Sequence, residues 1–192
     1  KPVTRYFDRI TRPEQIIQSF PNAIQTMLDP ADCGPACISL CQDIQGQTFD
    51  YPEEFFKERI HSIRRPRPDD FQIKEAAEKI KKSKNPIIIS GGGVFYSNAM
   101  EELSNFATKH NIPVTQTVMG YSTMKRDHSH YAGQIGGLGG KNTNELAKET
   151  DLAIAVGTKL ADFTTGSWAN FENKNFKLVS INVSRFDANK HM

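Results

Sequence analysis

The sequence predicts an α/β protein in which a Rossmann-like, doubly wound parallel sheet follows a partial α/β piece. Four short apolar runs lack the alternation of a strand with one wet face, as expected of parallel strands covered on both faces. These runs are residues 87–90, 112–118, 151–156 and 178–183. Helical segments separate several of them, which favours parallel pairing.

Small or polar residues follow each predicted strand. They are residues 90–93, 117–120, 157–158 and 182–184. In open parallel sheets ligands bind at the carboxyl ends of the strands. Any ligand of this domain is therefore expected beside these residues.

Residues 1–50 are predicted to form the partial α/β piece. A helix with Pro13 in its first turn runs towards Asp29, and Pro21 is expected to kink or divide it. A strand at residues 36–40 follows. One helix and one strand cannot bury a core. The piece is therefore expected to be the tail of a domain whose beginning is missing, or to pack against another surface, a second copy included.

Residues 51–70 are predicted to be a linker, and residues 71–192 the second domain. The prolines of the linker keep the residues before them extended. Its arginines at residues 64–67 have the charge to meet phosphate, but a solvated linker is favoured. A helix beginning at residues 69–70 is expected to bury Ile73, Ala76, Ala77 and Ile80.

Residues 86–110 form the βαβ unit around which the second domain is organised. A triplet of glycines, Gly91, Gly92 and Gly93, follows the first strand at once. Ser97 is expected to cap the next helix, which ends near His110. The buried stripe of that helix is predicted to be Met100, Leu103, Phe106 and Ala107.

The three glycines are the candidates for binding a cofactor. Gly91 and Gly93 match half of a dinucleotide fingerprint, but Tyr96 stands where its third glycine belongs. Gln116 and Thr117 end the next strand, where an acidic residue would bind ribose. Turn geometry and close packing are therefore favoured over phosphate binding, and valine at Gly92 is expected to damage folding.

Residues 131–140, YAGQIGGLGG, are a second glycine-rich stretch. Asn142 or Thr143 is expected to cap the short helix that follows it.

Cysteine and histidine spacing does not predict a metal site. Cys33, Cys37 and Cys41 lie four apart, wider than iron–sulfur spacing, and are expected to be small buried residues in a reducing compartment. His128 and His130 lack a third ligand at a supporting distance, so a polar loop is favoured.

Composition excludes two classes of partner. A net charge of +2 over 192 residues is no nucleic-acid signature. Apolar runs fall short of the roughly 20 residues of a membrane span, and nothing resembles a signal peptide. A cytoplasmic protein is expected.

Taken in order, these segments resemble the thiamine-diphosphate enzyme superfamily. Residues 34–45, GPACISLCQDIQ, are similar to the closing strand of its pyrimidine-binding domain, with Cys41 in place of the usual proline. Residues 86–93 resemble the first strand of its central domain, and residues 151–158 and 178–183 resemble later strands. The resemblance covers nearly the whole chain.

Within the superfamily, residues 159–168, KLADFTTGSW, resemble the trihydroxycyclohexanedione acylhydrolases of inositol catabolism. Residues 136–147 fit the same family. Acetohydroxyacid synthases, which hold FAD on this domain, carry an Arg-Phe-Asp-Asp-Arg run at the position of residues 159–163. The arginines that would meet the FAD phosphates are absent here, which disfavours FAD.

The resemblance implies an enzyme that hydrolyses a C–C bond of a cyclic 1,2-diketone to give 5-deoxyglucuronate, with thiamine diphosphate as electron sink and Mg²⁺. It also implies that the activating glutamate precedes Lys1 and that the G-D-G…N motif lies in a third domain. The chain is then expected to be an inactive excerpt without catalytic residues, cofactor or metal of its own. Its partners would be the flanking domains and a second copy in a homo-oligomer, the small-molecule substrate binding the full-length enzyme.

Two alternatives stay open. One is a nucleotide-binding module of the FAD or NAD type, built on the glycine turns. The other is a part of a different thiamine enzyme, such as an acetolactate-synthase-like lyase.

Overall fold

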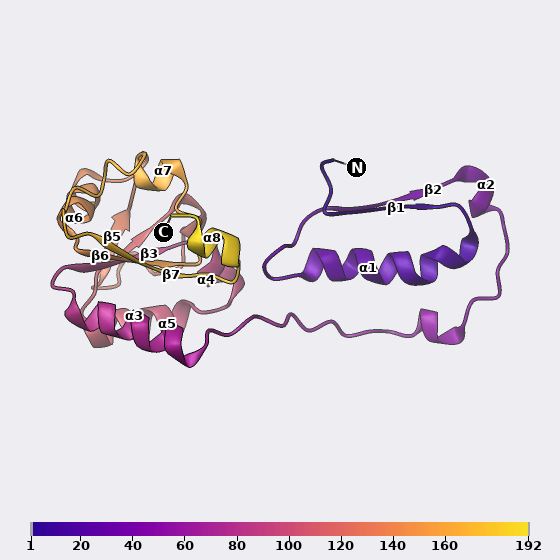
Figure 1. Cartoon of the computed structure of the whole chain (residues 1–192), viewed down its shortest axis with the longest axis horizontal. Coiled ribbons are helices and arrows are strands. Elements are labelled where there is room, and N and C mark those ends of the chain that lie inside the picture. The colour runs from indigo at the N-terminus through magenta and orange to yellow at the C-terminus, as the bar shows by residue number, and fades with distance from the viewer. Residues whose placement is uncertain (1, 192) are drawn as a thin grey trace. The chain divides into compact units, whose positions relative to one another are not determined.

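A computed structural model of the chain describes residues 2–191, which divide between Pro66 and Arg67 into two compact units (Figure 1). Within the described residues, no helix is both long enough and apolar enough to cross a membrane. The expected domain boundaries, at residues 50 and 70, remain predictions.

The smaller unit is one βαβ turn followed by short helical segments. Its elements are β1 (Tyr6–Ile10), η1 (Pro13–Gln15), α1 (Ile16–Leu28), β2 (Ala36–Leu40), α2 (Gln42–Gln45) and η2 (Glu53–Phe56). The two strands pair in parallel, from Tyr6 opposite Ala36 to Ile10 opposite Leu40. The sequence reasoning missed β1, because residues 1–12 show no hydrophobic periodicity.

Pro21 was expected to kink or divide its helix, but α1 is continuous through it, so the division is wrong. Proline removes one backbone donor, that to the carbonyl of Ile17. Tertiary contacts support the turn on which this bond is lost: Ala23 is buried, and the hydroxyl of Ser19 donates to the carboxylate of Asp8 on β1. Packing against the strand pair therefore outweighs the missing bond.

The smaller unit buries little by itself. Among the described residues, its buried apolar side chains are Ile10 and Ala23. An apolar groove of about 440 Å³ stays open on the unit. Its lining residues are Ile16, Phe20, Ile38, Leu40 and Phe55. This agrees with the expectation that the piece requires a further surface to cover it.

The cysteines depart from expectation. Cys33 and Cys37 are exposed and Cys41 is half-buried, all three as free thiols. Cys37 is paired with Phe7 and alternates with Ile38, which lines the groove beside α1. It therefore lies on the uncovered face of the strand pair, and the prediction of buried cysteines is wrong for Cys33 and Cys37.

The larger unit is a doubly wound parallel sheet, as predicted (Figure 1). Its elements are α3 (Asp70–Lys82), β3 (Pro86–Ser90), α4 (Gly92–Tyr96), α5 (Met100–His110), β4 (Val114–Gln116), η3 (Val118–Gly120), β5 (Tyr131–Gln134), α6 (Lys141–Glu149), β6 (Leu152–Val156), α7 (Asp162–Thr165), β7 (Lys177–Ile181) and α8 (Arg185–Asn189). The strand order is β5-β4-β3-β6-β7, and every pairing is parallel.

Each face of the sheet has its own apolar core. Helices α3 and α5 cover one face, where Ile80 and Leu103 pack with Ile88 and Ile154 (Figure 1). On the other face, Ala147 of α6 packs with Ile87, Ile89, Ala153 and Ala155. Successive β3 residues thus point to opposite cores, which is why the run shows no alternation.

Strand β5 corrects the expected count of four strands in this domain. The sequence of β5, Tyr-Ala-Gly-Gln, has the composition of a loop, and its Gly133 has φ +99°. The pairing with β4 also shifts register between Val114 and Thr115. A short edge strand with a glycine and an irregular register gives no periodic signal in sequence.

Three helix details also differ. Ser97 ends α4 instead of capping α5, because the chain first turns through Asn98 at φ 53°. Gly140, not Asn142 or Thr143, is the N-cap of α6. Ile73 is 51% exposed rather than buried, since it lies in the first turn of α3 beyond the edge of the sheet core.

Asp151 joins the turn between α3 and β3 to the start of β6 at the amino end of the sheet. Its carboxylate accepts from the backbone amides of Lys84 (2.8 Å) and Asn85 (3.1 Å) and from the hydroxyl of Ser83. Burial raises the pKa of this carboxyl, but the hydrogen bonds from Lys84, Ser83 and Asn85 outweigh it and leave the pKa below its ordinary value of 3.8. The ionised form therefore stabilises the fold.

We expect Asp151→Asn to lower the unfolding free energy by about 1 kcal/mol near pH 7. The NH₂ group of asparagine would face the hydrogen-bond donors of residues 83–85 and could accept from none of them. The contribution of Asp151 is fully present above the ordinary pKa and is lost as pH falls through the lowered pKa of the folded state. The difference between wild type and variant should therefore shrink in strong acid. Urea unfolding at several pH values measures it, with Asp127→Asn as the surface control, and a difference constant with pH would contradict the assignment.

Candidate functional site

The carboxyl ends of β3, β4, β6 and β7 meet at one edge of the sheet, as the sequence predicted. The amide of Gly91 donates to the Val156 carbonyl (2.9 Å), and that of Thr117 donates to the Ser90 carbonyl (3.0 Å). The amide of Gly157 donates to the carbonyl of Ile181 at 2.8 Å. The four strand ends thus form one continuous edge held by backbone bonds.

The glycine turn after β3 packs directly against the end of β6. The amide of Gly93 donates to the Gly157 carbonyl at 2.9 Å. A Cβ added to Gly91 would lie 2.3 Å from the oxygen of Gly157, and one added to Gly93 would lie 2.6 Å from its Cα. Two of the three glycines are therefore required by close backbone approach.

Gly92 is the least demanding glycine of the triplet. The nearest atom to a Cβ added there is the Met119 oxygen at 3.0 Å, and its φ is not left-handed. The sequence predicted that a side chain at Gly92 would damage folding, but the closest backbone contacts are those of Gly91 and Gly93. The amides of Gly91 and Gly93 are already bonded to β6 and its loop, and whether the triplet binds a cofactor stays a prediction.

A buried polar network lies beneath this edge. Gln116 is 1% exposed, and its Nε2 donates to the Met124 carbonyl (3.0 Å) and to Thr123 Oγ1 (3.3 Å). Thr123 also donates to the Gly120 carbonyl (2.7 Å), and its hydroxyl bonds to that of Ser90. Gln116 stands where a dinucleotide fold has its ribose-binding acid, and here its side chain is committed to the core.

The network could not be found from spacing. Thr123 and Met124 lie in a segment without regular structure, and no pattern singled them out. The one signal was that Gln116 and Thr117 are uncharged polar residues at the end of a buried strand.

The loop after β6 has an unusual backbone. Leu160 (φ 48°), Gly166 (57°), Ser167 (54°) and Trp168 (69°) are all left-handed. For residues other than glycine this conformation costs about 1 kcal/mol or more each and clusters at functional sites. The Ser167 hydroxyl donates to Asp162 Oδ1 at 2.9 Å. The loop coincides with the stretch that carries the family resemblance, residues 159–168.

The edge presents apolar side chains to solvent. Phe163 is 73% exposed at the end of the sheet. Other exposed apolar residues in the connecting segments are Phe95, Tyr96, Val118, Met119, Tyr121 and Leu138. The Tyr121 hydroxyl accepts from Arg126 at 2.8 Å, and the guanidinium lies 5.2 Å from the ring centre. This surface suits another protein segment better than a phosphate group.

The histidines lie at the amino end of β5, away from the candidate edge. His130 Nε2 bonds to Asn111 Oδ1 (3.0 Å), and His128 Nδ1 accepts from the His130 amide (3.1 Å). Over residues 2–191, no three His, Cys, Asp or Glu gather in a way that could hold a metal ion. The described residues therefore do not fit a Mg²⁺–diphosphate site.

Residues 73–192 match the family model described as "Thiamine pyrophosphate enzyme, central domain". Over 190 residues the chain is 47% identical to a Clostridium botulinum protein and 45% identical to a Bacillus velezensis protein. Both are named 3D-(3,5/4)-trihydroxycyclohexane-1,2-dione hydrolase. Each match covers 99% of this chain and 30% of the relative.

A solved structure supports the fold independently. The crystal structure of benzoylformate decarboxylase from Polynucleobacter necessarius superposes with a TM-score of 0.74. The match covers 95% of this chain and 33% of that one, at 22% sequence identity. It therefore speaks for the fold alone.

The parallel sheet and the family match agree on residues 73–192, and the relatives extend the similarity to nearly the whole chain. The protein belongs to the thiamine pyrophosphate enzyme family, whose central domain it contains.

Proposed function

We propose that this chain is the part of a thiamine-diphosphate-dependent hydrolase that spaces and positions its catalytic domains. The substrate of the whole enzyme would be trihydroxycyclohexane-1,2-dione, opened to 5-deoxyglucuronate in myo-inositol catabolism. The observation that carries the proposal is the 43–47% identity, along 99% of the chain, to relatives named for that hydrolysis.

The geometry of the sheet edge is consistent with a structural role for this chain, that of spacing and positioning the catalytic domains. The amides of Gly91 and Gly93 are bonded to the β6 end, and Gln116 is held in the core. Within residues 2–191 no cluster suits a metal. Thiamine diphosphate and Mg²⁺ would then bind to flanking domains of a homo-oligomeric, cytoplasmic enzyme, and the isolated chain would be inactive.

A domain replacement tests the proposal. The matching 190 residues of the Clostridium botulinum relative are exchanged for this chain, and hydrolysis of trihydroxycyclohexane-1,2-dione is measured. We expect kcat/KM within about tenfold of the parent. The matched control carries the corresponding segment of the Polynucleobacter decarboxylase instead, which at 22% identity should not restore activity.

A folded chimera that binds thiamine diphosphate but does not open the ring would contradict the proposal and favour another thiamine enzyme, such as an acetolactate-synthase-like lyase. Calorimetry on the isolated chain completes the test. We expect no binding of thiamine diphosphate with Mg²⁺, and micromolar binding of FAD or NAD would instead support a nucleotide-binding module.

A further inference from the structure

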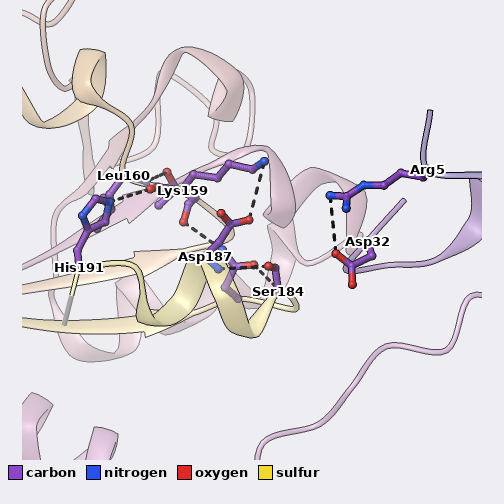
Figure 2. Close-up of polar contacts among 9 residues, drawn as sticks. Arg5, Asp32, Lys159, Leu160, Ser184, Asp187 and His191 are labelled. Carbon is purple, nitrogen blue, oxygen red and sulfur yellow. Dashed lines mark hydrogen bonds and ion pairs between the residues drawn. The ribbon is translucent and has the colours of Figure 1, made fainter. Parts of the chain in front are cut away.

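The segment after β7 lies against the loop after β6 (Figure 2). Lys159 Nζ is 3.8 Å from Asp187 Oδ2, and His191 Nε2 donates to the Lys159 carbonyl at 3.3 Å. The His191 ring centre is 4.9 Å from that of Trp168. Two separate points of the loop, at its start and at its end, thus contact residues 187–191.

The segment has its own means of keeping this position. The Ser184 hydroxyl accepts from the Asp187 amide (3.2 Å) and caps α8 (Figure 2). Just before it, Asn182 Nδ2 donates to the Thr158 carbonyl at 3.1 Å. Asp187 is only 16% exposed, so its carboxylate is held beside Lys159 rather than free in solvent.

The loop has a strained backbone, part of which its own contacts hold, since Leu160 is buried in the core and Ser167 bonds to Asp162. Leu160, Ser167 and Trp168 all have the left-handed conformation that bulky residues avoid, and an unrestrained loop would relax from it. The contacts from residues 187–191 fall beside this strain: Lys159 precedes Leu160, and Trp168 carries the contact with His191.

The loop in turn positions the glycine-rich segment before α6. The Phe163 carbonyl accepts from the Gly137 amide at 2.8 Å. Gly136, at φ +95°, lets this carbonyl approach so closely that an added Cβ would lie 2.0 Å from it. A shift of the loop at Phe163 must therefore move residues 136–137 or break their bond.

We propose that residues 184–191 are a strap that holds the loop of residues 159–168 in its left-handed conformation and, through the Phe163 carbonyl, fixes the glycine segment at the carboxyl edge. Loosening the strap moves all three segments together. The ion pair makes the strap sensitive to ionic strength, because Lys159 is 74% exposed and screened by salt.

The chain carries its own reporter, since Trp168 is its single tryptophan. The double variant Asp187→Asn with His191→Ala removes the ion pair with Lys159 and both contacts of His191. We expect acrylamide to quench Trp168 more strongly and the Gly137 amide to exchange hydrogen about tenfold faster. The Ile154 amide in β6 should keep its protection. Glu172→Gln, which removes an ion pair with Lys148 on the same unit, is the control and should change neither.

Exchanging the two charges of the ion pair tests whether residues 184–191 hold the loop through this pair or only cover it. Lys159→Glu with Asp187→Lys restores the ion pair and should return the Gly137 exchange rate to that of wild type, whereas each single change raises it. In the variant Asp187→Asn with His191→Ala, unchanged hydrogen exchange at Gly137 together with a more accessible Trp168 would overturn the proposal. If the variant Asp187→Asn with His191→Ala also loses the protection of Ile154, the single variant Asp187→Asn decides. Its Gly137 amide should exchange faster than that of wild type, and the exchange should depend less on salt. If neither difference is seen, the proposal is likewise overturned.

Discussion

Gly91→Ala is expected to lower the unfolding free energy of the larger unit by about 3 kcal/mol, the upper range for an overpacked site. The new Cβ would lie 2.3 Å from the Gly157 oxygen and 2.8 Å from the Thr158 Cα, and both are backbone atoms that cannot rotate away. Relief requires β3 and β6 to separate at their carboxyl ends, which would break the bond from the Gly91 amide to Val156.

Gly92→Ala is the matched control. Its Cβ meets the Met119 oxygen at 3.0 Å, and a shift of a few tenths of an ångström accommodates it. Alanine is also a better helix former than glycine at the start of α4, so the net change should stay within about 1 kcal/mol. Urea unfolding of the two variants compares them directly. Equal losses would mean that the turn demands glycine for its backbone conformation and not for its contact with β6.

Gln116→Leu is expected to lower the unfolding free energy by about 2 kcal/mol, although leucine is an apolar side chain of similar size. Inside the core, the Met124 carbonyl would lose the hydrogen bond that Gln116 Nε2 donates. Thr123 Oγ1 would lose the other hydrogen bond from Gln116. The segment of residues 117–124 would then be held by fewer bonds, so its amides should exchange hydrogen faster than those of β3.

Gln134→Leu provides the comparison for this change. Gln134 is the register partner of Gln116 on the neighbouring strand β5, but it is half-buried, so water can reach its amide. We expect a loss below about 1 kcal/mol there. A loss at Gln116 no larger than at Gln134 would show that the buried network contributes little.

The sheet was predictable because its strands are buried on both faces. The apolar runs that became β3 and β6 show this directly, and the small residues after them correctly located the carboxyl edge. Strand β5 was not predictable, since Tyr-Ala-Gly-Gln has the composition of a loop and pairs only because β4 lies beside it.

The candidate edge was predicted in place but not in detail. That glycines follow β3 is visible in sequence, whereas the contact of Gly91 and Gly93 with Gly157 depends on the order of β3 and β6 in the sheet. The strap contacts between Lys159, Asp187 and His191 join residues 28 to 32 positions apart in the sequence, and no local rule places them together.

The network of Ser90, Gln116 and Thr123 has an evolutionary consequence. A single replacement of Gln116 or Thr123 leaves a buried polar atom unpaired. Exchanging all three residues together avoids this only where the side chain that replaces Gln116 still donates to the Met124 carbonyl. The intermediate steps are the unstable ones. These three positions are therefore expected to change as a set across descendants of this sequence, with strong epistasis between them, and a sequence that carries one substitution should carry the others.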